Sequence, residues 1–268
     1  VDDITAPVPN VSSLPAIKAQ CGITVSSFPT ATDNCVGTLT ATTNSPLTYS
    51  VQGTYSILWK YNDGNGNSVT QTQAVIIQDT IAPVPNVAVL STVTAQCSAT
   101  VTTIPTATDN CRGVIQATTT SPLTFTAQGT HTITWVYNDG NGNTTTQTQT
   151  VVINDNTPPT ITTPCPSNIT VCSGQNITWT EPQATDNCSA VTRTRSHVPG
   201  STFANGTTTV TYTFTDAKGN STSCNFTVTV GGGVNVSIAA TALPDFCQGA
   251  AQLTATVTNA SQNATYSY

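Results

Sequence analysis

Apolar and polar residues alternate over several stretches of this chain, and the alternation predicts β-strands. In residues 56–61, the side chains of Ile57, Trp59 and Tyr61 share one face, and the residues between them share the other. No stretch shows a sustained helical period. We therefore predict an all-β protein whose tryptophans on this row, Trp59 and Trp135, pack in a core rather than stack on sugars. The same inward row recurs as Ile133, Trp135 and Tyr137, and as Val210, Tyr212 and Phe214.

The chain repeats itself about every 76 residues. Each repeat opens with an aspartate, carries the sequence Ala-Thr-Asp-Asn-Cys and ends its aromatic strand in a turn with Gly-Asn. Short strands separated by Gly, Pro and Asn in a unit of this length indicate a small antiparallel sandwich. We predict repeats at residues 1–78, 79–154 and 155–230. A glycine hinge and the start of a truncated module would follow at 231–268, and we expect both ends to be cuts through a longer array.

Nine of the eleven aspartates fall into three columns of this repeat. The first column opens each repeat, the second lies in the Ala-Thr-Asp-Asn-Cys sequence, and the third lies in the turn after the aromatic strand. The columns are Asp3, Asp79 and Asp155; Asp33, Asp109 and Asp186; and Asp63, Asp139 and Asp216. This regular placement of acid makes a bound divalent cation the leading chemical hypothesis.

Composition narrows the classes of function. Only 7% of residues are charged and the net charge is −6, so the chain lacks the basic surface that nucleic acid requires. Its nine cysteines are not arranged as paired C-x-x-C motifs, which argues against zinc and favours disulfides formed in an oxidising compartment. No apolar run is long enough to span a membrane.

The third repeat resembles the hyalin repeat (HYR) family. The resemblance rests on a combination of residues, and it extends over roughly 1–230 if the first two repeats are included. It implies immunoglobulin-like β-sandwiches of extracellular proteins linked to adhesion, arranged here as an elongated tandem array. The near-identical copies also resemble large surface adhesins of gliding Bacteroidetes. The matching residues are Pro158, Pro159, Cys165, Pro166, Trp179, Pro182, Asp186, Asn187, Pro199, Gly200, Phe203, Gly206, Val210, Tyr212, Asp216, Gly219, Asn220 and Cys224.

The first two repeats depart from the family at two cysteines. Gln71 and Gln147 stand where the third repeat has Cys224, and Cys165 is also unmatched in both. Because these cysteines occur together or not at all, we expect the disulfide Cys165–Cys224. The remaining predicted pairs each close a loop of about 15 residues, worth roughly 3 kcal/mol. They are Cys21–Cys35, Cys97–Cys111 and Cys172–Cys188, and Cys247 is left without a partner.

In an immunoglobulin-like sandwich the incoming linker and two of the loops lie at one end. All three aspartate columns would then converge at the junction with the preceding repeat. Clustered carboxylates repel one another, and Ca²⁺ accepts carboxylates together with amides such as those of Asn34, Asn110 and Asn187. One Ca²⁺ per junction is therefore one interpretation. The other is ordinary turn chemistry, because Asp, Asn and Gly are common hairpin residues.

Catalysis finds little support in the sequence. Glu181 is the single glutamate, His131 stands in the column of Tyr55, and His197 lies in a variable segment, so we expect no enzyme. We expect instead a stalk segment of an extracellular, cell-surface adhesin or filament, whose immediate partners are neighbouring repeats of the same chain. Two alternatives stay open: a module that binds surface glycans or proteins through its loops, and a subunit of a homopolymeric filament.

Overall fold

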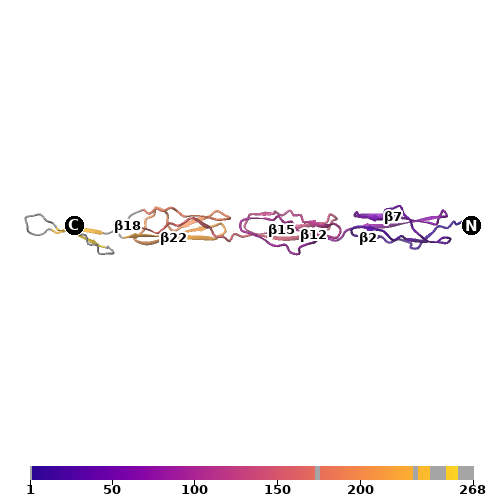
Figure 1. Ribbon diagram of the computed structural model, residues 1–268, viewed down its shortest axis with the longest axis horizontal. Helices are drawn as coiled ribbons and strands as arrows, with labels where there is room; N and C mark the ends of the chain where they lie inside the picture. The colour runs from indigo at the N-terminus through magenta and orange to yellow at the C-terminus, as the bar shows by residue number, and fades with distance from the viewer. Residues whose placement is uncertain (1, 173–175, 232–234, 242–251, 259–268) are drawn as a thin grey trace, which may run out of the picture. The chain divides into compact units, whose positions relative to one another are not determined.

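The structure, a computed structural model, describes residues 2–172, 176–231, 235–241 and 252–258. Within these ranges the chain consists of strands and loops (Figure 1), and no helix there is long and apolar enough to cross a membrane. The chain divides into two compact units, residues 1–153 and 154–268. The all-β prediction and the tandem sandwiches are confirmed.

The first repeat forms its sandwich from three small sheets. Their strand orders are β1-β4-β5, β2-β8-β7 and β3-β6. The hairpin of β7 and β8 is antiparallel, whereas β2 pairs in parallel with the far end of β8. The strands are β1 (Val8–Pro9), β2 (Ile17–Ala19), β3 (Ile23–Thr24), β4 (Thr30–Asp33), β5 (Gly37–Thr40), β6 (Thr48–Tyr49), β7 (Gly53–Asn62) and β8 (Ser68–Ile77).

The second repeat has the same topology, with sheets β13-β12-β9, β10-β16-β15 and β11-β14. Its long hairpin, β15 and β16, again receives a parallel strand, β10. The strands are β9 (Val84–Pro85), β10 (Val93–Ala95), β11 (Ala99–Thr100), β12 (Thr106–Asp109), β13 (Gly113–Gln116), β14 (Thr124–Phe125), β15 (Gly129–Asn138) and β16 (Thr144–Ile153).

The third repeat has a four-stranded sheet, β18-β22-β21-β20, and a two-stranded sheet, β17-β19. Beyond it, β23 and β24 form an antiparallel hairpin. Cys247 lies outside the described residues. The strands are β17 (Thr160–Thr163), β18 (Ile169–Cys172), β19 (Gln183–Thr185), β20 (Thr192–Arg195), β21 (Gly206–Thr215), β22 (Ser221–Gly231), β23 (Asn235–Thr241) and β24 (Gln252–Thr258).

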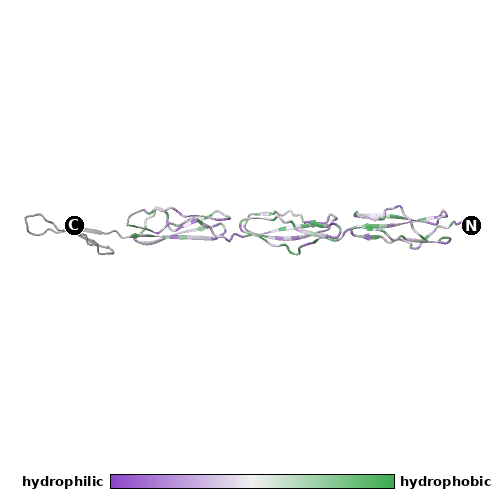
Figure 2. Cartoon of the chain, in the orientation of Figure 1, coloured by the Kyte–Doolittle hydropathy of each residue, from purple (hydrophilic) through white to green (hydrophobic). Residues whose placement is uncertain are grey.

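The predicted inward row forms the centre of each core. Ile57, Trp59 and Tyr61 are fully buried, while Leu58 between them is 53% exposed. Figure 2 shows hydrophobic positions alternating with hydrophilic ones along the strands. The burial of Trp59 and Trp135 confirms that they pack in the core. Each indole N–H donates to a glutamine of the neighbouring strand of the hairpin, Gln73 at 3.0 Å and Gln149 at 3.1 Å. The buried indole N–H of each of these two cores thus has a hydrogen-bond partner.

A glutamine fastens the first segment of repeats 1 and 2 to their last strand. Gln71 Nε2 donates to the carbonyl of Val11 at 2.7 Å, and its Oε1 accepts from the Tyr61 hydroxyl at 2.9 Å. Gln147 makes the equivalent bonds to Val87 and Tyr137. These are the positions where the third repeat has Cys224, so a pair of hydrogen bonds does in two repeats what a disulfide does in the third.

The cysteine pairing corrects the sequence analysis in three places and confirms it in one. Cys165 and Cys224 are joined as predicted. Cys21 bonds to Cys111 of the next repeat, so the pairs Cys21–Cys35 and Cys97–Cys111 are both wrong. Cys172 is a free thiol, so Cys172–Cys188 is wrong as well, although Cys97 and Cys188 are themselves disulfide-bonded.

The reason for the correction is the direction of the strands. Cys21 follows β2, whose parallel pairing with β8 sets Ala19 opposite Ile77 at the carboxyl end of the repeat. Cys35 lies in the turn between β4 and β5, beside Asp3 at the amino end. Two cysteines about 15 residues apart thus lie at opposite ends of one sandwich, and Cys21 meets the following repeat instead.

Candidate metal centre

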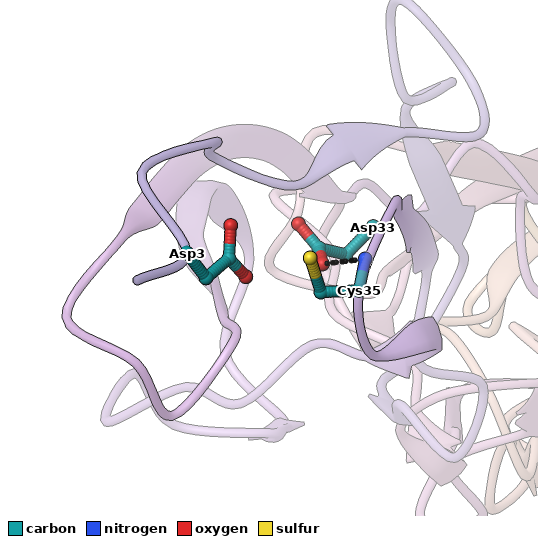
Figure 3. Close-up of side chains that lie close together, drawn as sticks. All are labelled: Asp3, Asp33 and Cys35. Atoms are coloured by element: carbon teal, nitrogen blue, oxygen red, sulfur yellow. Dashed lines mark hydrogen bonds between the residues drawn. The ribbon is translucent and has the colours of Figure 1, made fainter. Parts of the chain in front are cut away.

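The first two aspartate columns meet at the amino end of each repeat. In repeat 1, ligand atoms of Asp3, Asp33 and Cys35 all lie within 4.8 Å of one another. Figure 3 shows the carboxylates of Asp3 and Asp33 facing each other, Asp3 from the opening segment and Asp33 from the end of β4. The same grouping recurs as Asp79, Asp109 and Cys111, and as Asp155, Asp186 and Cys188.

The second-column carboxylate is held by the backbone that follows it. Asp33 Oδ1 accepts from the amides of Cys35 at 2.8 Å and Val36 at 3.1 Å. Gly37 then adopts a φ of +82°, which lets the chain turn into β5. Asp109 and Asp186 accept the same two amides in their own repeats. Hydrogen bonds within the turn therefore hold one oxygen of each carboxylate and leave the other oxygen without a donor from the turn.

That other oxygen has no protein partner. The Oδ2 atoms of Asp33, Asp109 and Asp186 are buried and accept no hydrogen bond in the structure. Asp33 and Asp109 as whole residues are each only 4% exposed. A buried carboxylate oxygen without a donor is costly, and each one lies beside a second carboxylate of like charge. A cation between the two carboxylates would remove both costs.

The first-column carboxylate is positioned by the linker and by the neighbouring hairpin turn. Asp3 Oδ1 accepts from the amide of Thr5 at 3.1 Å, and Asp79 and Asp155 make the same bond two residues on. Asn65 Nδ2 reaches Asp3 Oδ2 at 3.3 Å, and Asn67 Nδ2 donates to the Asp3 carbonyl at 3.0 Å. The hairpin turn thus supports the site from outside.

The third-column aspartates are not members of these three groups, although Asp63 is near enough to contribute to the raised pKa of the Cys35 thiol. Asp63 Oδ1 accepts from the amides of Asn65 and Asn67, and its Oδ2 accepts from Asn67 Nδ2 at 2.7 Å. Asp139 and Asp216 are likewise occupied within their own turns. These carboxylates stabilise the hairpin turn, which is the second of the two interpretations left open by the sequence. Of the asparagines expected as ligands, Asn110 and Asn187 donate their side-chain amide N–H to the sulfur of the next cysteine.

These hydrogen bonds give the hairpin aspartates a testable pH dependence. Partial desolvation acts to raise the pKa of Asp139, but hydrogen bonds from Asn143 and the turn backbone outweigh it and lower the pKa below its ordinary value of 3.8. A depressed pKa in the folded state contributes stability that is present above the unfolded pKa and is lost as the pH falls through the folded one. We expect D139N to lower the melting temperature at pH 6, with the difference from wild type shrinking below pH 3.8. The exposed Asp2 gives a matched control, since D2N should melt like wild type at both pH values; equal melting of D139N and wild type at pH 6 would contradict the assignment.

The sequence analysis did not predict that a cysteine would lie beside the two aspartates of each group. Their signal was present in the motif Asp-Asn-Cys. Partial desolvation, followed by the carboxylates of Asp3 and Asp33, raises the pKa of the exposed Cys35 thiol above its ordinary value of 9.0. Since Cys111 and Cys188 are disulfide-bonded, the ligands that all three groups share are carboxylate oxygens, which suit a hard cation.

Comparison with known proteins places these repeats in a family. Residues 154–230 match the HYR domain, and residues 83–153 match the HYR-like domain with 4 cysteines, although Cys97 and Cys111 are the only cysteines of that segment. The chain is 36% identical over 232 residues to Hyalin of Strongylocentrotus purpuratus and 35% identical over 201 residues to Hyalin of Lytechinus variegatus. These alignments cover 78% and 69% of this chain but 19% and 38% of the relatives.

The solved structures that align with this chain include cadherin ectodomains. The extracellular cadherin domains 1–4 of protocadherin gamma B7 align with 88% of this chain and 75% of their own at 10% identity and a TM-score of 0.35. Drosophila N-cadherin EC1-3 aligns with 83% of this chain and 99% of its own at 13% identity and a TM-score of 0.29. Neither likeness carries a functional argument, and the resemblance to gliding-bacterium adhesins stays a prediction. The family matches and the two Hyalin relatives show that this chain is built from hyalin-repeat (HYR) modules.

Proposed function

We propose that this chain is a spacer segment of an extracellular adhesion protein, in which tandem HYR modules hold a distal binding region away from the cell surface. The observation that carries the proposal is the Cys21–Cys111 disulfide, which joins two consecutive repeats across 90 positions of sequence. A bond of this kind has little value for catalysis but resists separation of one module from the next. The proposal assigns the chain no enzymatic role.

The disulfides also support the extracellular location. Six cysteines among the described residues are bonded, and such bonds persist in oxidising compartments. The surface is covered mainly by neutral polar residues, with 7% charged residues in the chain.

Hydrogen bonds reinforce the same junction. Gln20 Oε1 accepts from the amide of Thr80 at 2.9 Å, and Gln52 Oε1 accepts from the amide of Asp79 at 2.7 Å. Asp79 is the first-column aspartate of repeat 2, and Cys111 belongs to its acidic group. The cross-link and the acidic pair therefore occupy one junction between repeats 1 and 2.

We include Ca²⁺ in this proposal as the occupant of the acidic pairs. The support is the recurring pair of carboxylates within 4.8 Å and the buried Oδ2 atoms that no donor reaches. Ca²⁺ binds carboxylate and carbonyl oxygens in flexible geometry. At the pair of Asp79 and Asp109 it would join the linker to the β12–β13 turn and so fix the second repeat against the segment that connects it to the first.

Mechanical extension of single molecules tests the spacer role. When the ends are pulled under oxidising conditions, the residues between Cys21 and Cys111 stay closed in the disulfide loop. With C97S/C188S in both proteins, so that no other disulfide starts inside this loop, unfolding should therefore release about 300 Å less length than in the variant that also carries C21S/C111S, given 3.3–3.6 Å per extended residue over 90 positions.

The variant provides the control because it keeps the Cys165–Cys224 disulfide, which a reducing agent would also open. Equal lengths for wild type and variant would contradict the proposal, since the junction would then not be locked. Saturable binding of the isolated chain to surface glycans or proteins would favour a binding module over a spacer.

A further inference from the structure

Two thiols stay unpaired in the described part of the chain, and they stand at positions that are bonded in the other repeats. Cys35 occupies the position of Cys111 and Cys188 in the Asp-Asn-Cys sequence, and both of those are disulfide-bonded. Cys172 occupies the position of Cys21 and Cys97, which are also bonded. The first repeat thus lacks a partner for one cysteine type, and the third repeat lacks a partner for the other.

The structure shows what each type bonds to. The Cys21–Cys111 disulfide joins the cysteine that follows β2 of one repeat to the cysteine in the β12–β13 turn of the next. The two Cα atoms lie 5.0 Å apart, which is normal for a disulfide. The bond has a direction. We call the cysteine at the carboxyl end of its repeat, such as Cys21, the donor, and the cysteine at the amino end of the next repeat, such as Cys111, the receiver.

Cys35 is held in the same local structure as the bonded Cys111. Its amide donates to Asp33 Oδ1 at 2.8 Å, as the amide of Cys111 donates to Asp109 Oδ1 at 2.9 Å. Two residues after each of these cysteines stands a glycine with a φ near +80°, Gly37 at +82° and Gly113 at +78°. The Cys35 side chain is exposed, so a second repeat has access to its sulfur.

Cys172 has the strand environment expected of the donor. It ends β18, which pairs in parallel with β22 and sets Cys172 opposite Gly231 at the carboxyl end of that strand. In repeat 1, β2 pairs in the same way with β8 and leads to Cys21. Cys172 is exposed as well.

We propose that Cys35 and Cys172 are the two open ends of a disulfide ladder, and that Cys35 accepts the Cys172-type cysteine of another hyalin repeat. The reaction removes two electrons and two protons from the two thiols, and a small disulfide such as oxidised glutathione takes them up. The Cys172 thiolate displaces one glutathione to form a mixed disulfide, and the Cys35 thiolate then displaces the second. This linkage goes beyond the spacer role, because it makes the array covalently continuous from one set of repeats to the next.

A complementation experiment with two copies of the chain tests this pairing. Both variants carry C247S; one also carries C35S and the other C172S, and each is treated with oxidised glutathione alone and in an equal mixture. We expect covalent dimers in the mixture and only monomers in each variant alone, because only the mixture contains one donor and one receiver. With one variant labelled with nitrogen-15, peptide mapping should find Cys172 of the C35S variant bonded to Cys35 of the C172S variant.

Retention of the Cys21–Cys111 peptide pair in both variants shows that the fold is intact. Dimers that form as readily in either variant alone would overturn the directional pairing. Cys35 and Cys172 that end only as glutathione adducts in the mixture would overturn it too. In the C247S protein with both thiols present, the proposal predicts a ladder of multimers that collapses to monomer on reduction, and a bond between Cys35 and Cys172 of one copy would contradict it.

Discussion

Replacing both Cys165 and Cys224 by alanine is expected to lower the unfolding free energy of the third repeat by about 4 kcal/mol, the chain-entropy value for a cross-link that spans 59 positions. A module of this size has a total stability of only about 4–11 kcal/mol, at 0.05–0.15 kcal/mol per residue. The bond ties the segment before β18 to β22, as the hydrogen bonds of Gln71 and Gln147 tie the corresponding segments of repeats 1 and 2. Thermal and denaturant unfolding of the variant measures the loss.

The first repeat offers the matched comparison. Q71A removes the bonds from Gln71 to Val11 and Tyr61, and we expect a loss of about 1–3 kcal/mol, because two hydrogen bonds disappear without a change of covalent structure. A larger loss from Q71A than from C165A/C224A would show that the disulfide does not carry the stability of its repeat. Equal unfolding free energies of C165A/C224A and wild type would likewise show that the disulfide does not stabilise the third repeat.

Calcium is expected to raise the melting temperature of the chain, and the acidic pair of repeat 2 gives the sharpest variant. A site that is filled at about 100 times its Kd adds about 2.7 kcal/mol to the folded state. For a module of this length that corresponds to roughly 10–20 °C. D79N/D109N removes both charges of one site while each asparagine keeps an oxygen for the turn amides.

The two conditions separate metal binding from general damage to the fold. In EDTA the variant should melt no lower than wild type, because the unpartnered Asp109 Oδ2 and its repulsion with Asp79 are both relieved. In excess Ca²⁺ the second repeat of wild type should melt well above that of the variant. A variant that melts lower by the same amount in both conditions would indicate turn chemistry alone.

The strands and their faces could be predicted from the sequence because alternation is a local property. Ile57, Trp59 and Tyr61 read as one row and are buried as one row. The meeting of the first two aspartate columns was predictable from the shared end of a sandwich. The sequence alone could not show that the third column has a different role. That role is visible only in the hydrogen bonds by which Asn67 holds the Asp63 carboxylate within its own hairpin turn.

The disulfides show why spacing alone misleads. A loop of about 15 residues is easily closed by a disulfide. The chain between Cys21 and Cys35, however, runs from the carboxyl end of the repeat to its amino end, so the two cysteines lie far apart. The pair Cys165 and Cys224 was predictable because both cysteines are missing together elsewhere. The replacement of that bond by Gln71 was visible in the sequence only as a loss of cysteine.

The central claim is that each repeat forms one calcium site from a linker aspartate and a turn aspartate. Calorimetric titration of the whole chain with Ca²⁺, after removal of divalent ions, tests it most directly. We predict three equivalents per chain, one for each acidic group, and two equivalents for D79N/D109N. Loss of an equivalent from D139N instead, or no binding heat at millimolar Ca²⁺, would contradict the claim and return the aspartate columns to turn chemistry.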